Sequence, residues 1–112
     1  MITQGETAPD FTLPRDGGGN LTLSALRPGK VVLYFYPKDD TPGCTLEAQD
    51  FTARAADFAT TGAKVIGISR DSIKSHDRFC KKHGLGITLV SDEAGHTCED
   101  YGVWLEKSMY GK

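Results

Sequence analysis

Cys44 is the residue of this sequence whose position most favours covalent chemistry. Thr41 is a good helix N-cap, and Pro42 suits the first helical position, where no backbone N–H is required. Cys44 is therefore expected in the first turn of a helix, facing free backbone amides and the positive end of the dipole. Both favour the thiolate, since a helix N-terminus lowers a cysteine pKa from about 8.5 to roughly 3.5–7.5. Position alone leaves a second interpretation equally open, in which Cys44 is a small core residue.

The elements around Cys44 follow the order strand, helix, strand. Residues 31–36 form a continuous apolar run, which is typical of a strand buried on both faces of a parallel sheet. Apolar or small side chains recur at helical spacing from Cys44 to Phe58, and residues 64–69 form the next strand. This βαβ unit predicts parallel strands joined by a right-handed crossover.

Further elements are expected on both sides of this unit. Gly-rich residues 16–20 separate two short alternating segments, which indicates an N-terminal β-hairpin. The other expected elements are a helix capped by Ser72 or Ser75 and stopped at Gly84, a strand at 87–90 and a short helix at 94–101.

Length and composition exclude several classes of protein. The 112 residues predict a single domain over 1–112, and the net charge of −2 without clustered Lys and Arg argues against nucleic-acid binding. No apolar stretch approaches the ~20 residues of a membrane span, and the N-terminus lacks an export signal. Three cysteines do not fit a secreted disulfide scaffold, so a cytoplasmic protein is expected.

The segment around Cys44 resembles the active-site motif of peroxiredoxins. The P-x-x-x-T-x-x-C signature is matched by Pro37, Thr41 and Cys44. The fuller match, F-Y-P-K-D-x-T-P-G-C-T-x-E, is similar to the PrxQ or bacterioferritin-comigratory subgroup. The resemblance also covers residues 8–11, 65–69, 89–92 and 101–104, which is most of the chain. It implies a thioredoxin-like α/β fold.

The resemblance implies a role for each matching residue. Cys44 would be the peroxidatic nucleophile that reduces hydrogen peroxide or an alkyl hydroperoxide and becomes a sulfenic acid. The hydroxyl of Thr41 would contact the peroxide, Pro37 would shield the pocket, and the amides of Gly43 and Cys44 would stabilise negative charge. Glu47 would hold a catalytic arginine. No metal, haem or flavin is implied.

A second thiol is needed to close the catalytic cycle. Many members of the subgroup carry it five residues after the first, where this chain has Gln49. Other members carry it in the following helix, so the resemblance implies a Cys44–Cys80 disulfide, recycled by thioredoxin in a monomeric enzyme. Such a disulfide requires local opening of a helix, because helix-embedded thiols rarely start close enough. Cys80 could instead be a buried core cysteine, and Cys98 is a bystander or a minor alternative partner.

The chain departs from the family at its C-terminal end. Peroxiredoxins of this type continue beyond the region of Trp104 with further strands, a helix and the catalytic arginine. This sequence ends at Lys112, and none of its five arginines lies in a matching context. The fold is therefore expected to be C-terminally truncated, with residues 31–36 as an edge strand.

Three alternatives remain open from the sequence. Cys44 could act as a one-cysteine peroxidase with an external thiol, or the chain could be a non-catalytic thioredoxin-like binding module. His76, Cys80 and His83 also follow helical spacing and could hold zinc together with His96 and Cys98, although no C-x-x-C pair supports a metal site.

Overall fold

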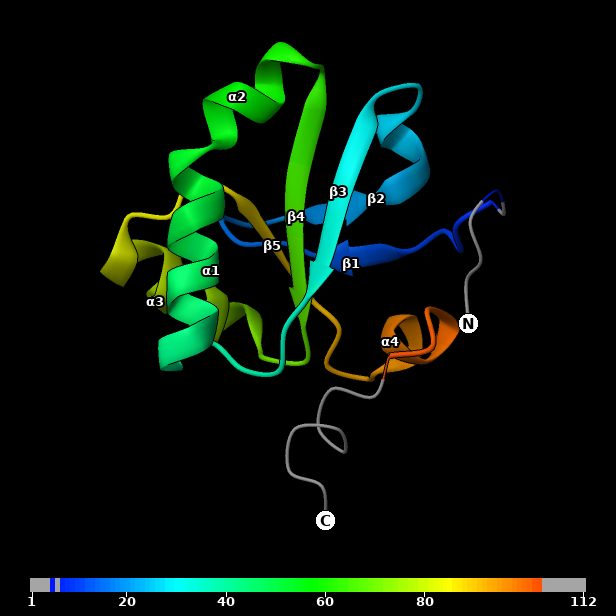
Figure 1. Cartoon of the computed structure of the whole chain (residues 1–112). Helices are drawn as coiled ribbons and strands as arrows, with labels where there is room; N and C mark the ends of the chain where they lie inside the picture. The colour runs from blue at the N-terminus through cyan, green and yellow to red at the C-terminus, as the bar shows by residue number, and fades with distance from the viewer. Residues whose placement is uncertain (1–4, 6, 104–112) are drawn as a thin grey trace.

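The computed structural model describes residue 5 and residues 7–103, and its elements form a three-stranded sheet with the helices of residues 42–83 on one face and a β-hairpin on the other (Figure 1). The expected tail from Trp104 to Lys112 lies outside the described residues. In chain order the elements are β1 (Thr12–Pro14), β2 (Asn20–Thr22), the 3₁₀ helix η1 (Leu23–Leu26), β3 (Lys30–Phe35), α1 (Pro42–Ala53), α2 (Ala55–Thr60), β4 (Ala63–Ser69), α3 (Ile73–His83), β5 (Thr88–Ser91) and α4 (His96–Asp100).

The main sheet has the order β3-β4-β5, and all its strands are parallel. Val32 pairs with Val65, and Ile68 pairs with Val90. The predicted βαβ unit and the third parallel strand are therefore confirmed. The hairpin β1-β2 is a separate antiparallel pair, and an isolated bridge between Arg15 and Val90 links it to β5.

Strand β3 is half-buried on both faces, because its side chains alternate between two cores. One core lies between the sheet and the hairpin, and the other lies between the sheet and helices α1 and α3 (Figure 1). Val31, Leu33 and Phe35 pack against the first core, and Val32 and Tyr34 pack against the second. The apolar run that predicted this strand thus reflects real contacts on both sides.

The long helices match the prediction except at one break, while α4 is shorter than the predicted 94–101 and the 3₁₀ helix η1 was not predicted. Ser72 caps α3, since its hydroxyl accepts a hydrogen bond from the Ser75 amide at 3.2 Å, and Gly84 ends the helix in the left-handed conformation with φ 61°. The predicted single helix from Cys44 is divided, because α1 ends at Ala53 and α2 begins at Ala55. The intervening Arg54 leaves helical geometry with φ −101° and ψ 4°.

Gly67 allows β4 to pack closely against its neighbours. A Cβ atom at this position would lie 2.8 Å from Tyr34 Cζ and 2.8 Å from Leu89 Cδ2. Gly67→Ala is therefore expected to lower the free energy of unfolding by about 1–3 kcal/mol, measured by urea denaturation. Gly86→Ala is the matched control, because its Cβ would make an ordinary 3.5 Å contact with the Thr52 methyl group. Equal stability of the two variants would contradict this account of the packing.

Candidate active site

The start of α1 places Cys44 as the sequence predicts. Thr41 occupies the N-cap position with extended backbone, and Pro42 is the first helical residue. Hydrogen bonding of the helix begins where the Thr45 amide donates to the Thr41 carbonyl oxygen at 2.8 Å. The amides of Gly43 and Cys44 precede that bond, so they belong to the part of the helix whose N–H groups have no acceptor within it.

The hydroxyl of Thr41 has a different partner from the one expected of a cap. It donates to the Lys38 carbonyl oxygen at 3.1 Å and makes no hydrogen bond to the first turn of α1. The predicted capping bond is therefore wrong, although the N-cap position is right. The hydroxyl instead closes the loop that follows β3, in which Pro37 is half-buried.

The two predicted reactive thiols pack against the same apolar core. Cys44 and Cys80 are both half-buried free cysteines. Each contacts the core between the sheet and the helices, which is built on Tyr36, Ala48, Val65, Phe79, Ile87 and Leu89. The fold thus brings α1 and α3, with one thiol each, to one face of the sheet (Figure 1).

A buried carboxylate holds the loop between β3 and α1. Asp39 accepts hydrogen bonds from the Tyr36 hydroxyl at 2.6 Å and from the Ser75 hydroxyl at 2.8 Å. Its Oδ2 atom also lies 2.7 Å from Nδ1 of His76, which is completely buried. Ser75 and His76 belong to the first turn of α3, so Asp39 fixes the loop before Cys44 onto the helix that carries Cys80.

The contacts of His76 indicate that both of its ring nitrogens carry protons. Nε2 lies 2.9 Å from the Val90 carbonyl oxygen, which can only accept, and Nδ1 faces the Asp39 carboxylate. Burial by itself lowers the pKa of His76, but the hydrogen bond and charge of Asp39 outweigh it, so the pKa is raised. The pair is therefore an imidazolium–carboxylate ion pair in the protein interior.

The next loop residue, Asp40, contacts the other end of α3. Its carboxylate lies 2.7 Å from Lys82 Nζ and 2.8 Å from His83 Nε2. The hydrogen bonds from Lys82 and His83 lower the pKa of Asp40. Asp40 has a positive φ of 58°, a conformation that Asp tolerates better than most residues. Both ends of α3 thus hold the loop that positions Cys44.

Tyr34 carries a buried polar group beside this site. Its ring stacks on Phe51 with a centroid distance of 4.6 Å, and its hydroxyl has no hydrogen-bond partner among the described residues. Burial raises the pKa of Tyr34, and the nearby Glu47, Cys44, Asp39 and Cys80 add to this effect. The hydroxyl is therefore a neutral donor, on a side chain that packs against the same core as both thiols.

The two remaining predicted residues differ in their surroundings. Glu47 is exposed one turn after Cys44, and partial burial raises the pKa of its carboxyl. Cys98 is buried in α4, where burial and the hydrogen bond with Asp92 raise its pKa to about 12. Cys98 does not belong to the core that Cys44 and Cys80 share.

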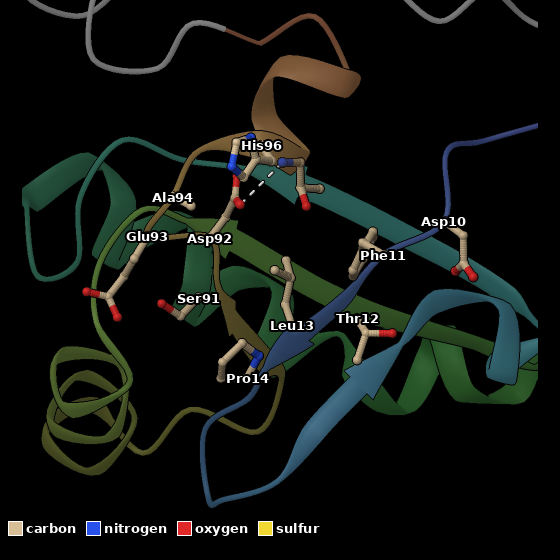
Figure 2. A pocket seen from close by; sticks show the side chains of 11 residues that line it. Asp10, Phe11, Thr12, Leu13, Pro14, Ser91, Asp92, Glu93, Ala94 and His96 are labelled. Atoms are coloured by element: carbon tan, nitrogen blue, oxygen red, sulfur yellow. Dashed lines mark hydrogen bonds between the residues drawn. The ribbon is translucent and has the colours of Figure 1, made fainter.

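A pocket of about 430 Å³ lies between residues 10–14 and residues 91–97 (Figure 2), and neither Cys44 nor Cys80 lines it. Its lining includes Asp92, whose carboxylate accepts hydrogen bonds from the Thr97 and Cys98 amides. Asp92 therefore holds the start of α4, and no nucleophile of the candidate site lines this pocket.

The residues that position the two thiols were only partly visible in the sequence. Asp39 lies inside the matched motif, but nothing in the sequence shows that it binds His76. Of the three histidines considered for zinc, His76 faces Asp39 and His83 faces Asp40 instead. Over residues 5 and 7–103, no three His, Cys, Asp or Glu side chains are grouped as metal ligands would be.

No helix in the described part of the chain has the length and apolar character of a membrane span.

Comparison with known proteins identifies relatives over nearly the whole chain. The model of the AhpC/TSA family matches residues 4–112. The putative peroxiredoxin bcp of Coxiella burnetii is 50% identical over 111 residues, which cover 99% of this chain and 74% of that protein. Peroxiredoxin Bcp of Xanthomonas campestris is 50% identical over 103 residues, which cover 92% of this chain but only 64% of that protein.

A solved structure supports the same relationship. The Xanthomonas campestris bacterioferritin comigratory protein, studied for its alkyl peroxide reduction activity in trapped intermediate/ligand complexes, superimposes with a TM-score of 0.83 at 48% identity. The match covers 91% of this chain and 65% of that one. The thioredoxin-like peroxiredoxin fold expected from the motif is therefore confirmed, and the chain spans about two thirds of that relative.

Proposed function

We propose that this chain, which belongs to the AhpC/TSA family and within it to the Bcp/PrxQ peroxiredoxins, reduces hydrogen peroxide and alkyl hydroperoxides at Cys44. The observation that carries the proposal is the place of Cys44 in the first turn of α1, directly after the loop fixed by Asp39. The alkyl peroxide reduction described for the Xanthomonas relative supports this substrate class.

The first step is attack of the Cys44 thiolate on the O–O bond. The sulfur takes one oxygen and becomes a sulfenic acid, while the other oxygen leaves with a proton as water or an alcohol. The peroxide is reduced by two electrons, and these come from the sulfur. Amides at a helix N-terminus stabilise negative charge, so the first turn of α1 suits both the thiolate and the departing oxygen.

The motif residues take supporting roles in this proposal. The amides of Gly43 and Cys44 would hold the peroxide oxygen that becomes negative. Thr41 would turn its hydroxyl from the Lys38 carbonyl oxygen to the bound peroxide, and Pro37 would limit access of water. Glu47 would position an arginine, for which this chain offers no assigned residue.

The second step is formation of a disulfide between Cys44 and Cys80. The Cys80 thiol attacks the sulfenic sulfur, the S–S bond forms, and the hydroxyl leaves with the thiol proton as water. A disulfide requires Cα atoms about 4.4–6.8 Å apart, so α1, α3 or both must open locally. Opening α3 breaks its contacts with Asp39 and Asp40, and these contacts therefore limit how easily the disulfide forms.

The cycle closes when an external dithiol reduces the disulfide. Thioredoxin is the reductant proposed here, with the chain acting as a monomer in the cytoplasm, where a reducing environment returns both cysteines to thiols. A one-cysteine cycle with an external thiol is the alternative if Cys80 does not react.

Cys80→Ser is expected to leave the first oxidation intact and to abolish the intramolecular disulfide. After one equivalent of hydrogen peroxide, mass spectrometry should show Cys44 as sulfenic or sulfinic acid. Cys98→Ser is the matched control and should form the disulfide as the unmodified chain does, because Cys98 lies outside the core shared by the other two thiols. A disulfide in Cys80→Ser that is lost in the double variant with Cys98→Ser would assign resolution to Cys98 instead.

A further inference from the structure

The turn between β1 and β2 holds a carboxylate against the helix that carries Cys80. The Asp16 amide donates to the Leu89 carbonyl oxygen at 2.9 Å, and the Leu89 amide donates to Asp16 Oδ1 at 2.9 Å. Asp16 is thereby fixed on β5 through both its backbone and its side chain.

The second carboxylate oxygen of Asp16 faces α3. The Cys80 thiol donates to Asp16 Oδ2 with an Sγ–O distance of 3.7 Å. One turn earlier on α3, Asp77 accepts a hydrogen bond from the Gly17 amide at 2.9 Å. The turn therefore contacts α3 at two points on one helical face, one of which is the thiol itself.

The surroundings of the Cys80 sulfur are unfavourable to a negative charge. Burial, the charge of Asp16 and its hydrogen bond raise the pKa of the Cys80 thiol to about 12, and Asp39 and Asp77 contribute further. The hydroxyl of Tyr34 lies near it on β3. On the outer side of Asp16, Arg15 is the nearby cation, with Nη2 4.0 Å from Oδ1.

We propose that Asp16 is a positioning residue for Cys80, holding its thiol as a protonated hydrogen-bond donor for as long as α3 stays docked on the β1–β2 turn. Only the thiolate is strongly nucleophilic, so Cys80 becomes reactive when α3 leaves the turn. This restricts Cys80 to the opened state in which it can reach Cys44. The effect on disulfide formation with Cys44 rests on the proposed function, whereas the protonation of the Cys80 thiol in the docked helix does not.

Asp16→Asn tests this inference in the reduced chain without peroxide. In this variant the side-chain oxygen of Asn can still accept the hydrogen bond from the Leu89 backbone amide. The side-chain NH₂ group takes the place of the charged oxygen that accepts from the Cys80 thiol, and it can only donate. Alkylation of Cys80 by iodoacetamide, followed by peptide mapping from pH 6 to about pH 12.5 so that the range includes a midpoint near 12, is the measurement. The midpoint of the profile is expected to fall by about one pH unit, which corresponds to about tenfold faster alkylation below it.

Asp77→Asn is the matched control, because it removes a charge from α3 itself but keeps an acceptor for the Gly17 amide. Its midpoint should move much less. Loosening of α3 alone would also lower the midpoint, because an opened helix frees the thiol from burial and from Asp16, so amide hydrogen exchange of α3 is measured on the same variant. Exchange of the α3 amides that is accelerated in Asp16→Asn as much as the alkylation of Cys80 would overturn the inference. An Asp16→Asn midpoint equal to that of Asp77→Asn would overturn it as well.

The alkylation profile separates this inference from the proposed peroxidase cycle. If peroxide forms no Cys44–Cys80 disulfide in the unmodified chain, the resolving role of Cys80 is wrong, and the midpoint still decides the role of Asp16. If the disulfide forms but the midpoint does not shift, the cycle stands and the inference about Asp16 fails.

Discussion

Replacing Cys44 with serine is expected to abolish peroxide consumption. A serine hydroxyl is not ionised near neutral pH, and the step requires a sulfur that can take an oxygen and give up two electrons. The rate should fall to that of the uncatalysed reaction, a loss on the order of 10³-fold or more. The measurement is the initial rate of hydrogen peroxide or alkyl hydroperoxide loss with excess dithiothreitol.

The serine variant is also expected to fold normally, because Cys44 is only half-buried and serine has nearly the same size. Cys98→Ser is the control for general effects of removing a thiol. Peroxide turnover that survives in Cys44→Ser but fails in Cys98→Ser would move the nucleophile to α4 and contradict the proposed function.

The second large effect is expected at the buried ion pair. Asp39→Asn should lower the free energy of unfolding by about 3–5 kcal/mol, because it leaves the buried His76 imidazolium without its counter-ion. It also turns one acceptor oxygen into a donor facing the Tyr36 and Ser75 hydroxyls, which both donate to this side chain. Urea denaturation at pH 7 measures the loss.

The pH dependence of stability distinguishes loss of the ion pair from simple loss of packing. The pKa of His76 is raised in the folded protein, so its contribution is fully present below the unfolded value of about 6.5. The contribution is lost as the pH rises through the raised folded pKa. Asp39→Asn should remove this decline, whereas Asp40→Asn, at the exposed end of the loop, should retain it with a much smaller loss of stability.

Local patterns in the sequence were sufficient for most of the architecture. Three predictions rest on residues that are close together in sequence, and all three are confirmed: the strand β3, the N-cap of α3 at Ser72 and the end of α3 at Gly84. The break at Arg54 was missed because neither glycine nor proline marks it. The apolar face from Cys44 to Phe58 also continues across the break, so periodicity gives no sign of it.

The candidate site was predictable only where its residues are neighbours in sequence. Thr41, Pro42 and Cys44 share one segment, and a helix start can be inferred from it. The partners of Asp39 and Asp16 lie 37 and 64 residues away, at His76 and Cys80, and only the packing of the hairpin and α3 on the sheet brings them together. Burial of a polar residue is set by this packing, so an aspartate in a loop motif or a glycine-rich turn is expected at the surface.

A non-reducing peptide map after one equivalent of hydrogen peroxide, with free thiols alkylated, is the decisive test of the proposed Cys44–Cys80 cycle. We expect a dominant crosslink between the Cys44 and Cys80 peptides, with Cys98 alkylated. Recovery of Cys44 as an alkylated free thiol would contradict the claim that it reacts with peroxide. Cys44 recovered as sulfinic acid beside an alkylated Cys80 would keep Cys44 as the nucleophile and contradict the intramolecular cycle.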